Sequence, residues 1–250
     1  MAPTLPYSKF SKHEILSRCD ALKPYLPATD RFVRSELSAW LDGHGAVVIK
    51  PEWGEGGRYV CKVSHDERGY SLHTDSRLTH TTSFERLLEL LPVWTKTKRC
   101  IVQRLVHLQT FRGRPVDIRT IVQRNEKGVF EVTGSFIKIA PKSRFVTNVK
   151  QGGTIQKTDL YLLRSISGQA KRASVRDQLY GVSELIGQCL GEQFSNFVYG
   201  IDLGLDENGQ IWIIEVNTQP NLGILGEIDT RMRRRALSLR QYNQRRQRAR

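Results

Sequence analysis

Along much of the chain, apolar residues recur at every second position, the pattern of strands that bury one face. Elsewhere they recur three or four positions apart, which is typical of helices that cover a sheet. The predicted strands cover 46–50, 58–64, 70–73, 100–106, 116–123, 129–139, 199–205 and 210–216. The predicted helices cover one short helix within 1–30, then 30–41, 83–91, 174–190, and a C-terminal helix from near Ile224. Hairpins separated by helices, without regular strand–helix–strand units, indicate an α+β fold.

Cap and turn signals bound several of these elements. Ser11 and Glu14 form a capping-box pattern for the first helix, and Gly43 is expected to end the second. Ser83 is expected to cap the third helix. The dipeptide Asn208-Gly209 favours a tight turn in the last hairpin.

The composition excludes several classes of protein. The chain has 250 residues, of which 39% are hydrophobic and 26% are charged, which is typical of soluble globular proteins. No window approaches 18 consecutive apolar residues, and the first ten residues lack the layout of a signal peptide. The four cysteines are scattered without a CxxC pair. This pattern predicts a reducing, cytoplasmic compartment.

The net charge of +14 comes mostly from the C-terminus. Nine arginines and no acidic residue lie in 231–250, so the remaining 230 residues carry 14 − 9 = +5. Such a tail is suited to an acidic protein, an anionic surface or nucleic acid. A solvated helix end or frayed tail is the simpler interpretation. The remainder shows no zinc-finger, RNP-like or helix-turn-helix pattern.

The last predicted hairpin carries a candidate metal site. A turn at Asn208-Gly209 places Asp202 opposite Glu215, and period-two alternation puts Asn217 on the same face. Trp212, Ile214 and Val216 are then expected on the other face. Carboxylates so close repel each other unless a cation lies between them, and Mg²⁺ prefers oxygen ligands. The alternative is two surface carboxylates on an exposed hairpin.

Other segments suggest anion binding. Lys50 ends a predicted buried strand and precedes Gly54, Gly56 and Gly57, so a point charge and free backbone N–H groups can approach phosphate. A plain hairpin turn explains the same residues equally well. Asp117 and Arg119 share one strand face, which also fits an ordinary salt bridge. Lys138 and Asn148 are further candidates.

Taken together and in order, these motifs resemble the ATP-grasp superfamily, and in particular its YheC/YheD group of endospore-coat-associated proteins from spore-forming Bacilli. The resemblance extends from the PYLP sequence at 24–27 to Pro220 and is most specific in VDIR (116–119), TNVKQGG (147–153) and IDLGLDENGQIWIIEVNTQPN (201–221). RimK-like glutamate ligases share the same DIR, N…GG and EVN…P pattern. The resemblance implies two α+β lobes whose antiparallel sheets clamp ATP, here without a full N-terminal domain before them.

The resemblance also implies roles for individual residues. Lys50 resembles the phosphate-contacting lysine, and Arg119 and Lys138 resemble the catalytic cations near the γ-phosphate and acyl phosphate. The metal ligands correspond to Asp202, Glu215 and Asn217, for Mg²⁺ (two ions) with Mn²⁺ as a substitute. The nucleotide-binding positions correspond to Lys50, Gly54, Gly56, Gly57, Gln103, Arg104, Leu105, Val106, Asp117 and Asn148. Among these, 103–106 correspond to the linker strand whose backbone reads adenine.

The implied activity is ATP- and Mg²⁺-dependent carboxylate–amine ligation through an acyl phosphate, with small-molecule or peptide acids and amines as substrates. A spore-coat-associated protein with little turnover and a small-molecule kinase are the alternatives, and an independent nucleic-acid-binding protein ranks last. The expected location is the cytoplasm, with spore association. The expected divisions are a helical segment 1–45, an ATP-grasp domain 46–230 with lobes 46–106 and 107–230, and an Arg-rich tail 231–250.

Overall fold

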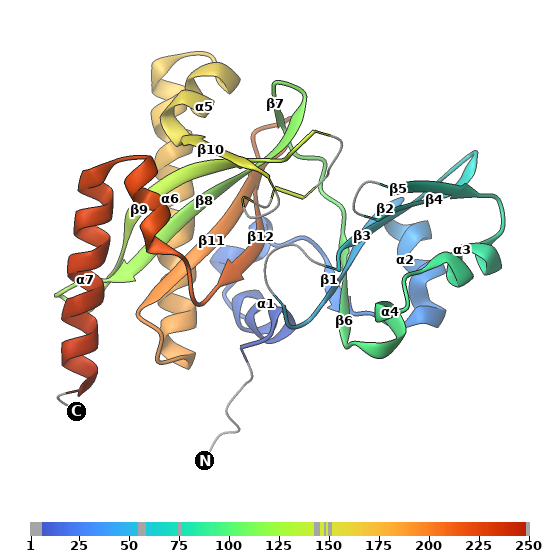
Figure 1. The fold of residues 1–250 in the computed structure, drawn as a ribbon, viewed down its shortest axis with the longest axis horizontal. Coiled ribbons are helices and arrows are strands. Elements are labelled where there is room, and N and C mark those ends of the chain that lie inside the picture. The colour runs from blue at the N-terminus through green and yellow to red at the C-terminus, as the bar shows by residue number, and fades with distance from the viewer. Residues whose placement is uncertain are drawn as a thin grey trace.

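Two antiparallel sheets lie side by side along the long axis of the molecule (Figure 1). The computed structural model describes residues 7–54, 59–74, 77–142, 146–147, 149 and 152–248. The first sheet has the strand order β1-β6-β2-β3-β4-β5, and the second has the order β10-β9-β8-β11-β12, with β7 paired to β8. We call the first sheet with its helices the first lobe, and the second sheet with its helices the second lobe.

The first lobe is built from residues 29–104. Its strands are β1 (Thr29–Arg31), β2 (Ala46–Pro51), β3 (Cys61–Asp66), β4 (Gly69–Thr74), β5 (Arg77–Thr81) and β6 (Cys100–Arg104). Its helices are the 3₁₀ helix η2 (Arg34–Glu36), α2 (Leu37–His44), α3 (Phe84–Leu90) and α4 (Trp94–Thr97). Val47 and Ile49 of β2 pack into a core with Leu37 and Leu87. Because side chains alternate along a strand, the neighbouring Lys50 projects from the opposite face of this sheet.

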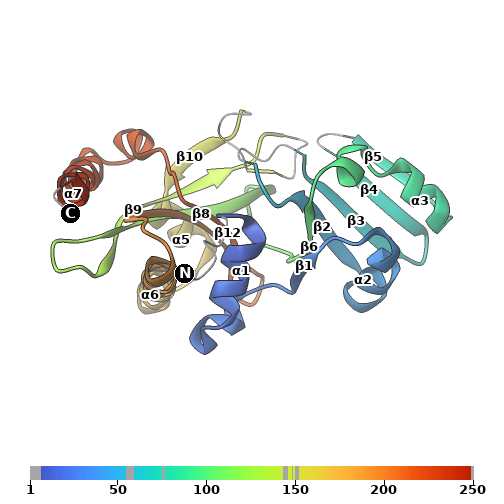
Figure 2. The same cartoon turned by 90° about the horizontal axis from the view of Figure 1, so that it is seen from below.

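The second lobe contains the longer strands. They are β7 (Thr110–Phe111), β8 (Arg114–Arg124), β9 (Phe130–Ile139), β10 (Thr154–Lys157), β11 (Val198–Leu205) and β12 (Ile211–Asn217). Its helices are α5 (Thr158–Ser165), α6 (Gln169–Gln193), the 3₁₀ helix η4 (Leu222–Glu227) and α7 (Thr230–Arg248). Figure 2 shows α6 and α7 on opposite sides of this sheet.

Each face of the second sheet has its own core. On the α6 side, Ile118, Ile137 and Ile201 pack with Leu179 and other residues of α6. On the other side, η4 and α7 cover Ile121 and Phe136. Because side chains alternate between the two faces of a strand, four charged residues lie on the same face as Ile121 and Phe136, namely Asp117, Arg119, Lys138 and Asp202. They lie beyond the part of this face that η4 and α7 cover.

The N-terminal helix α1 (Lys9–Ser17) bridges the two lobes. Together with the 3₁₀ helix η1 (Asp20–Tyr25) it contributes Ile15, Leu16 and Leu22 to the core of the second lobe. At its other end, the Lys9 backbone N–H donates to the carbonyl of Glu52, just after β2, at 2.9 Å. The helix lies below the junction of the sheets in Figure 2.

The N-terminal predictions need correction. The cap of the first helix is Ser8, whose side chain accepts from Ser11 N, and not Ser11 itself. The helix predicted for 30–41 is wrong at its start, because Thr29–Arg31 is the strand β1 and pairs with β6. The α-helix begins at Leu37 and runs past Gly43 to His44. Gly45, at a φ of +68°, ends it instead.

The final hairpin reaches the predicted pairing by a different route. Asp202 does pair with Glu215, but Leu205 pairs with Ile211, so the turn is longer than two residues. A β-bulge at Ile214 restores the register, because Leu203 pairs with Ile213. The face predicted for Val216 is confirmed, because Val216 joins the core. On the turn side of the bulge the faces are reversed: Ile211 and Ile213 join the core, whereas Trp212 and Ile214 do not.

The other strand and helix predictions agree with the structure to within about five residues, except that the C-terminal α-helix begins at Thr230 and the 3₁₀ helix η4 lies where it was expected to start. The strands β1, β5, β7 and β10, the α-helices α4 and α5, and the 3₁₀ helix η1 have no counterpart in the prediction. The Arg-rich segment is helical from Thr230 to Arg248 and packs on the second sheet, so it is not a frayed tail. Among the described helices, none is both long and apolar enough to cross a membrane. The domain boundaries stay a prediction.

Candidate active site

Four charged side chains of the second sheet form one ion-pair cluster, which we call the Asp202 cluster. Arg119 binds both oxygens of the Asp202 carboxylate, with Nε and Nη2 at 2.6 and 2.7 Å. Lys138 lies between two carboxylates, 2.9 Å from Asp202 and 3.1 Å from Asp117. Thr147 donates a hydrogen bond to Asp117. Because these strands are adjacent and in register, the sheet itself brings the four side chains together.

The two carboxylates of this cluster have opposite pKa shifts. Burial raises the pKa of Asp117 to about 6, and Lys138 only partly opposes the rise. Burial also acts on Asp202, but Arg119 and Lys138 outweigh it and hold the pKa of Asp202 at about 2. The cluster therefore holds one firmly ionised carboxylate and one that takes up a proton more easily.

Gly200 makes room for Arg119. A Cβ atom added at Gly200 would lie 2.9 Å from Nη1 of Arg119 and 2.8 Å from Cβ of Pro220. Any larger residue must therefore displace the guanidinium or the Pro220 segment. The glycine fixes the orientation in which Arg119 meets Asp202.

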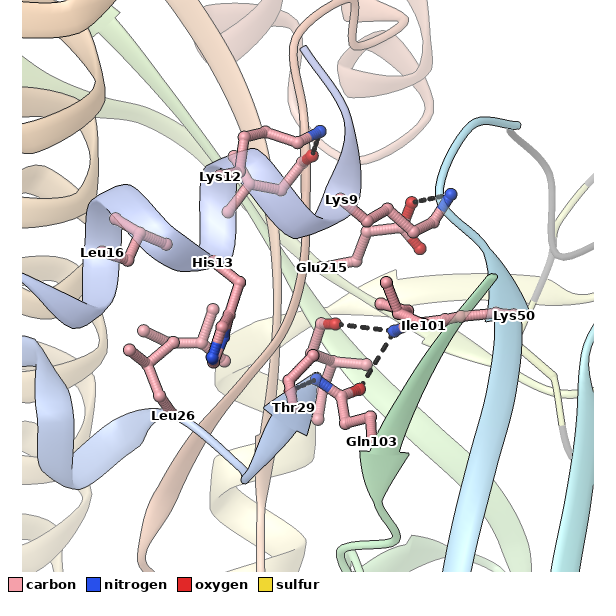
Figure 3. A pocket seen from close by; sticks show the side chains of 13 residues that line it. Lys9, Lys12, His13, Leu16, Leu26, Thr29, Lys50, Ile101, Gln103 and Glu215 are labelled. Atoms are coloured by element: carbon pink, nitrogen blue, oxygen red, sulfur yellow. Dashed lines mark hydrogen bonds and ion pairs between the residues drawn. The ribbon is translucent and has the colours of Figure 1, made fainter. Parts of the chain in front are cut away.

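Lys50 of the first lobe reaches across to the second. Its ammonium donates to Oε1 of Gln103 at 3.0 Å and to the carbonyl of Ile214 at 3.2 Å (Figure 3). Gln103 in turn donates to Oγ1 of Thr29 at 2.9 Å. Burial lowers the pKa of the Lys50 ammonium, and the negative charge of Glu215 partly opposes this decrease. Lys12 of α1 donates in the same way to the carbonyl of Val216, two residues further along β12. Lys50 and Lys12 therefore both bind backbone carbonyl groups on the free edge of this strand.

Glu215 lies between the lobes, next to Lys9. The ammonium of Lys9 is 3.5 Å from Oε1 of Glu215 (Figure 3). It also donates to the carbonyl of Gly54 at 2.7 Å. Burial favours the neutral form of Glu215, but Lys9 and Lys50 outweigh it and lower the pKa of Glu215. Helix α1 therefore joins the segment after β2 to strand β12.

Most of the predicted site residues meet at the junction of the lobes. Lys50, Gln103 and Glu215 line one pocket. The Asp202 cluster adjoins this pocket, because Asp202 lies opposite Glu215 in the pairing of β11 with β12. Asn217 lies opposite Gly200, and its Oδ1 accepts from Gln219 N at 2.8 Å. Gly56, Gly57 and Asn148 lie outside the described residues.

The predicted linker strand is partly engaged in the fold. The N–H of Arg104 donates to the carbonyl of Ala28, and that of Leu105 donates to the carbonyl of Ala46. The Arg104 guanidinium lies 4.8 Å from the ring centroid of Trp212 and so links the lobes. Val106 follows as half-buried irregular chain. The N–H groups of Arg104 and Leu105 are thus already used.

Sequence reasoning missed several residues around this pocket. Lys9, Lys12 and His13 of α1 all line it. Burial, aided by Lys50, lowers the pKa of His13. The sequence does show that these three polar residues lie among the apolar positions of α1. The pattern does not show which part of the protein a polar helix face contacts. Gly200 could have been found because it lies two residues before Asp202 and so shares a strand face with that carboxylate.

The oxygen donors at the junction fit a hard divalent cation. Among the described residues, the Glu215 carboxylate has an ion pair only with Lys9, at 3.5 Å. A cation bound by Asp202 would have to displace Arg119 and Lys138 from that carboxylate. Among the described residues, no group of three or more His, Cys, Asp or Glu side chains is placed to hold a metal. Any metal site here therefore combines two carboxylates with other oxygen donors.

The two antiparallel sheets with their helices match the ATP-grasp fold that the motifs predicted. The model of the family "YheC/D like ATP-grasp" matches residues 4–243, and the chain belongs to this family.

Two relatives from Bacillus subtilis (strain 168) are similar to the chain. Endospore coat-associated protein YheD is 26% identical over 249 residues, covering 94% of this chain and 54% of the relative. Endospore coat-associated protein YheC is 23% identical over 217 residues, covering 82% of this chain and 57% of the relative. The chain thus spans about half the length of these curated relatives.

Among solved structures, the chain is similar to N5-carboxyaminoimidazole ribonucleotide synthetase from Thermotoga maritima. The TM-score is 0.49 at 13% identity, covering 86% of this chain and 42% of the other. A second similar structure is N5-carboxyaminoimidazole synthetase from Staphylococcus aureus complexed with ADP. Its TM-score is 0.49 at 8% identity, covering 86% of this chain and 44% of the other.

Proposed function

We propose that the chain carries an ATP- and Mg²⁺-dependent carboxylate–amine ligase site that acts through an acyl phosphate. Membership of the YheC/D-like ATP-grasp family supports an ATP-dependent, ligase-type activity in general. The observation that carries the proposal is the charged junction, where Lys50 of one lobe comes close to Glu215 of the other beside the Asp202 cluster. Phosphate groups need such concentrated positive charge, and a divalent cation needs the oxygen donors.

In this proposal the nucleotide lies between the lobes. Lys50 contacts phosphate, and the segments with Gly54, Gly56, Gly57 and Asn148 approach it through their backbone. Gln103–Val106 line the base, with Asp117 near the phosphates. Asp202, Glu215 and Asn217 hold Mg²⁺, which neutralises phosphate charge when bound.

Arg119 and Lys138 are the proposed catalytic cations. A substrate carboxylate oxygen attacks the γ-phosphorus, the bond to the β–γ bridging oxygen breaks, and ADP leaves. An amine then attacks the acyl carbon, inorganic phosphate leaves, and the amine loses a proton to solvent. In both steps the two cations stabilise charge on oxygen, and the residues at the junction position the reactants. To do so, Arg119 and Lys138 turn from Asp202 toward phosphate.

Two other functions use the same fold. The names of both relatives favour an endospore-coat-associated role, and such a role with little turnover is one alternative. A small-molecule kinase would use a hydroxyl acceptor in place of the carboxylate. ADP release that depends on both an acid and an amine separates the ligase from these two.

The relatives also support spore association of this chain in a spore-forming bacterium, after synthesis in the cytoplasm. We propose small-molecule or peptide acids and amines as substrates. The charge of residues 231–250 supports an anionic partner as well.

The decisive experiment is calorimetric titration of ATP with and without Mg²⁺. Glu215→Ala is expected to abolish Mg²⁺-dependent binding while the protein stays folded, because the metal loses a carboxylate ligand. Glu207→Ala is the matched control, since Glu207 is an exposed carboxylate in the turn of the same hairpin. Mg²⁺-dependent binding that survives in Glu215→Ala contradicts the metal assignment, and an absence of binding in the wild type contradicts the proposed function.

A further inference from the structure

Helix α7 presents arginines on the side opposite to its contact with the second lobe. Ala236, Leu239 and Asn243 are buried, and Met232 packs in the same direction. All eight arginines of Thr230–Arg248 are exposed. Figure 1 places α7 at one end of the molecule, away from the junction of the lobes. The helix is therefore anchored by one face and leaves a basic face, which we call the arginine face, open to solvent.

Few of these charges are compensated. Arg235 binds Glu126 and Glu131, and Arg231 pairs with Asp229. Among the described residues, no carboxylate lies within ion-pair distance of the other six, which are Arg233, Arg234, Arg240, Arg245, Arg246 and Arg248. The helix itself contains no acidic residue.

Helix stability does not account for this pattern. Arginines in the last turn are favoured by the helix dipole, but Arg233 and Arg234 lie near the helix start, where positive charge is disfavoured. Like charges spaced three or four residues apart also repel one another. The arrangement is thus unfavourable for the isolated chain, and a bound polyanion would relieve it.

The average charge density of this face is close to that of a phosphate backbone. At 1.5 Å per residue, the face from Arg233 to Arg248 is about 22 Å long, so its six unevenly spaced arginines supply on average one charge per roughly 4 Å. One strand of duplex DNA carries a phosphate every ~3.4 Å. The guanidinium fork suits phosphate oxygens, and the helix has arginine but no lysine. The exposed Gln241 and Gln244 add amide groups between the arginines.

We propose that the arginine face of α7 binds double-stranded DNA through its phosphate backbone, independently of the ATP site. A helix on an outer edge, with half of its circumference exposed, can lie along a groove of the duplex. The contact is expected to be insensitive to base sequence and strongly dependent on salt.

The test is fluorescence anisotropy of a fluorescein-labelled 20-base-pair duplex at increasing NaCl concentration, without nucleotide. The first variant is R233Q/R234Q/R240Q/R245Q/R246Q. The matched control removes five exposed charges from the first lobe, as R68Q/R77Q/R86Q/K96Q/R99Q. Both variants lower the net charge by the same amount, so a difference between them reports position and not total charge.

The α7 variant is expected to lose at least tenfold in affinity at 50 mM NaCl and to show a flatter salt dependence, while the control changes less than threefold. R233Q/R234Q alone is expected to lose at least threefold, which keeps the test valid if the larger set unfolds. Absence of wild-type binding at 50 mM NaCl overturns the proposal, and so do equal losses in variant and control. Equally strong competition by poly-L-glutamate, at matched charge, also overturns it and points to an acidic polypeptide.

Discussion

The two lobes contribute to the candidate site in different ways. The second lobe supplies the Asp202 cluster from adjacent strands of one sheet, so strand register alone assembles it. The first lobe supplies Lys50 and Gln103, and Lys50 crosses to the carbonyl of Ile214 in β12. Lys9 of α1 pairs with Glu215 of the same strand. One sheet therefore sets the backbone positions beneath the Asp202 cluster, whereas the contacts of Lys50 and Lys9 depend on how the lobes meet. A nucleotide that binds between the lobes is expected to turn the side chains of Arg119 and Lys138 while their strands stay in register, and to shift the backbone on either side of the Lys50 and Lys9 contacts.

The largest expected effect comes from breaking the Asp202 cluster. Arg119→Met leaves a buried carboxylate with one cation in place of two, which is expected to cost about 3 kcal/mol of unfolding free energy. Urea denaturation measures this loss. Arg235→Met is the control, because Arg235 also binds two carboxylates but does so at the exposed surface, where ion pairs contribute much less. Equal losses in the two variants would contradict the view that burial strengthens the ion pairs of the cluster.

A pH series separates the two carboxylates of the cluster. The pKa of Asp117 is raised to about 6, so the folded state retains its proton where the unfolded state has lost it. Its contribution to stability is therefore complete below about pH 4 and is lost as the pH rises through about 6. The pKa of Asp202 is lowered to about 2, so its contribution is present above about pH 4 and is lost as the pH falls toward 2.

Asp117→Asn should remove the first dependence and keep the second. The measurement is the urea unfolding free energy of both proteins between pH 3 and pH 7, without nucleotide or metal. The stability difference between wild type and variant is expected to change between pH 4 and pH 6, in the direction of a relative loss for the wild type. A difference that stays constant over this range contradicts the raised pKa of Asp117.

The smallest expected effect concerns the contact between the lobes. Lys9→Met removes the hydrogen bond to the carbonyl of Gly54 and the ion pair with Glu215, and is expected to cost about 1 kcal/mol. Thermal unfolding monitored by circular dichroism measures it. Lys23→Met serves as the control, because the structure pairs Lys23 with the neighbouring, exposed Asp20 within the same 3₁₀ helix. If both variants leave the melting temperature unchanged, α1 does not hold the lobes together through Lys9.

The sequence was most informative where period-two alternation decides the outcome. Asp117 and Arg119 were expected on one face, and Asp202 was expected opposite Glu215, and the structure confirms both. The pairing of Asp202 with Glu215 is confirmed, although the two-residue turn from which it was predicted is wrong. A longer turn would have shifted the pairing, and the bulge at Ile214 shifts it back. Bulges have no clear pattern of residues, so only coordinates reveal such a compensation.

Contacts between distant elements were beyond the sequence argument. The spacing of Ile15 and Leu16 predicted a helix but not which core would receive it. The strand Thr29–Arg31 has no apolar pattern, and only its pairing with β6 defines it. Hydrophobic patterns fix local structure and the buried face of an element, whereas the choice of partner depends on the whole fold.

The position of α1 has a consequence for how the protein is made. Its apolar residues belong to the core of the second lobe, yet residues 29–104 build the first lobe before that core is complete. The contact of Lys12 with Val216 spans 204 residues. At a translation rate of 5–20 residues per second, the helix must wait roughly 10–40 seconds for its partner to be synthesised. The first lobe can fold on the ribosome during this interval, whereas the second lobe can close only after β12 has been synthesised.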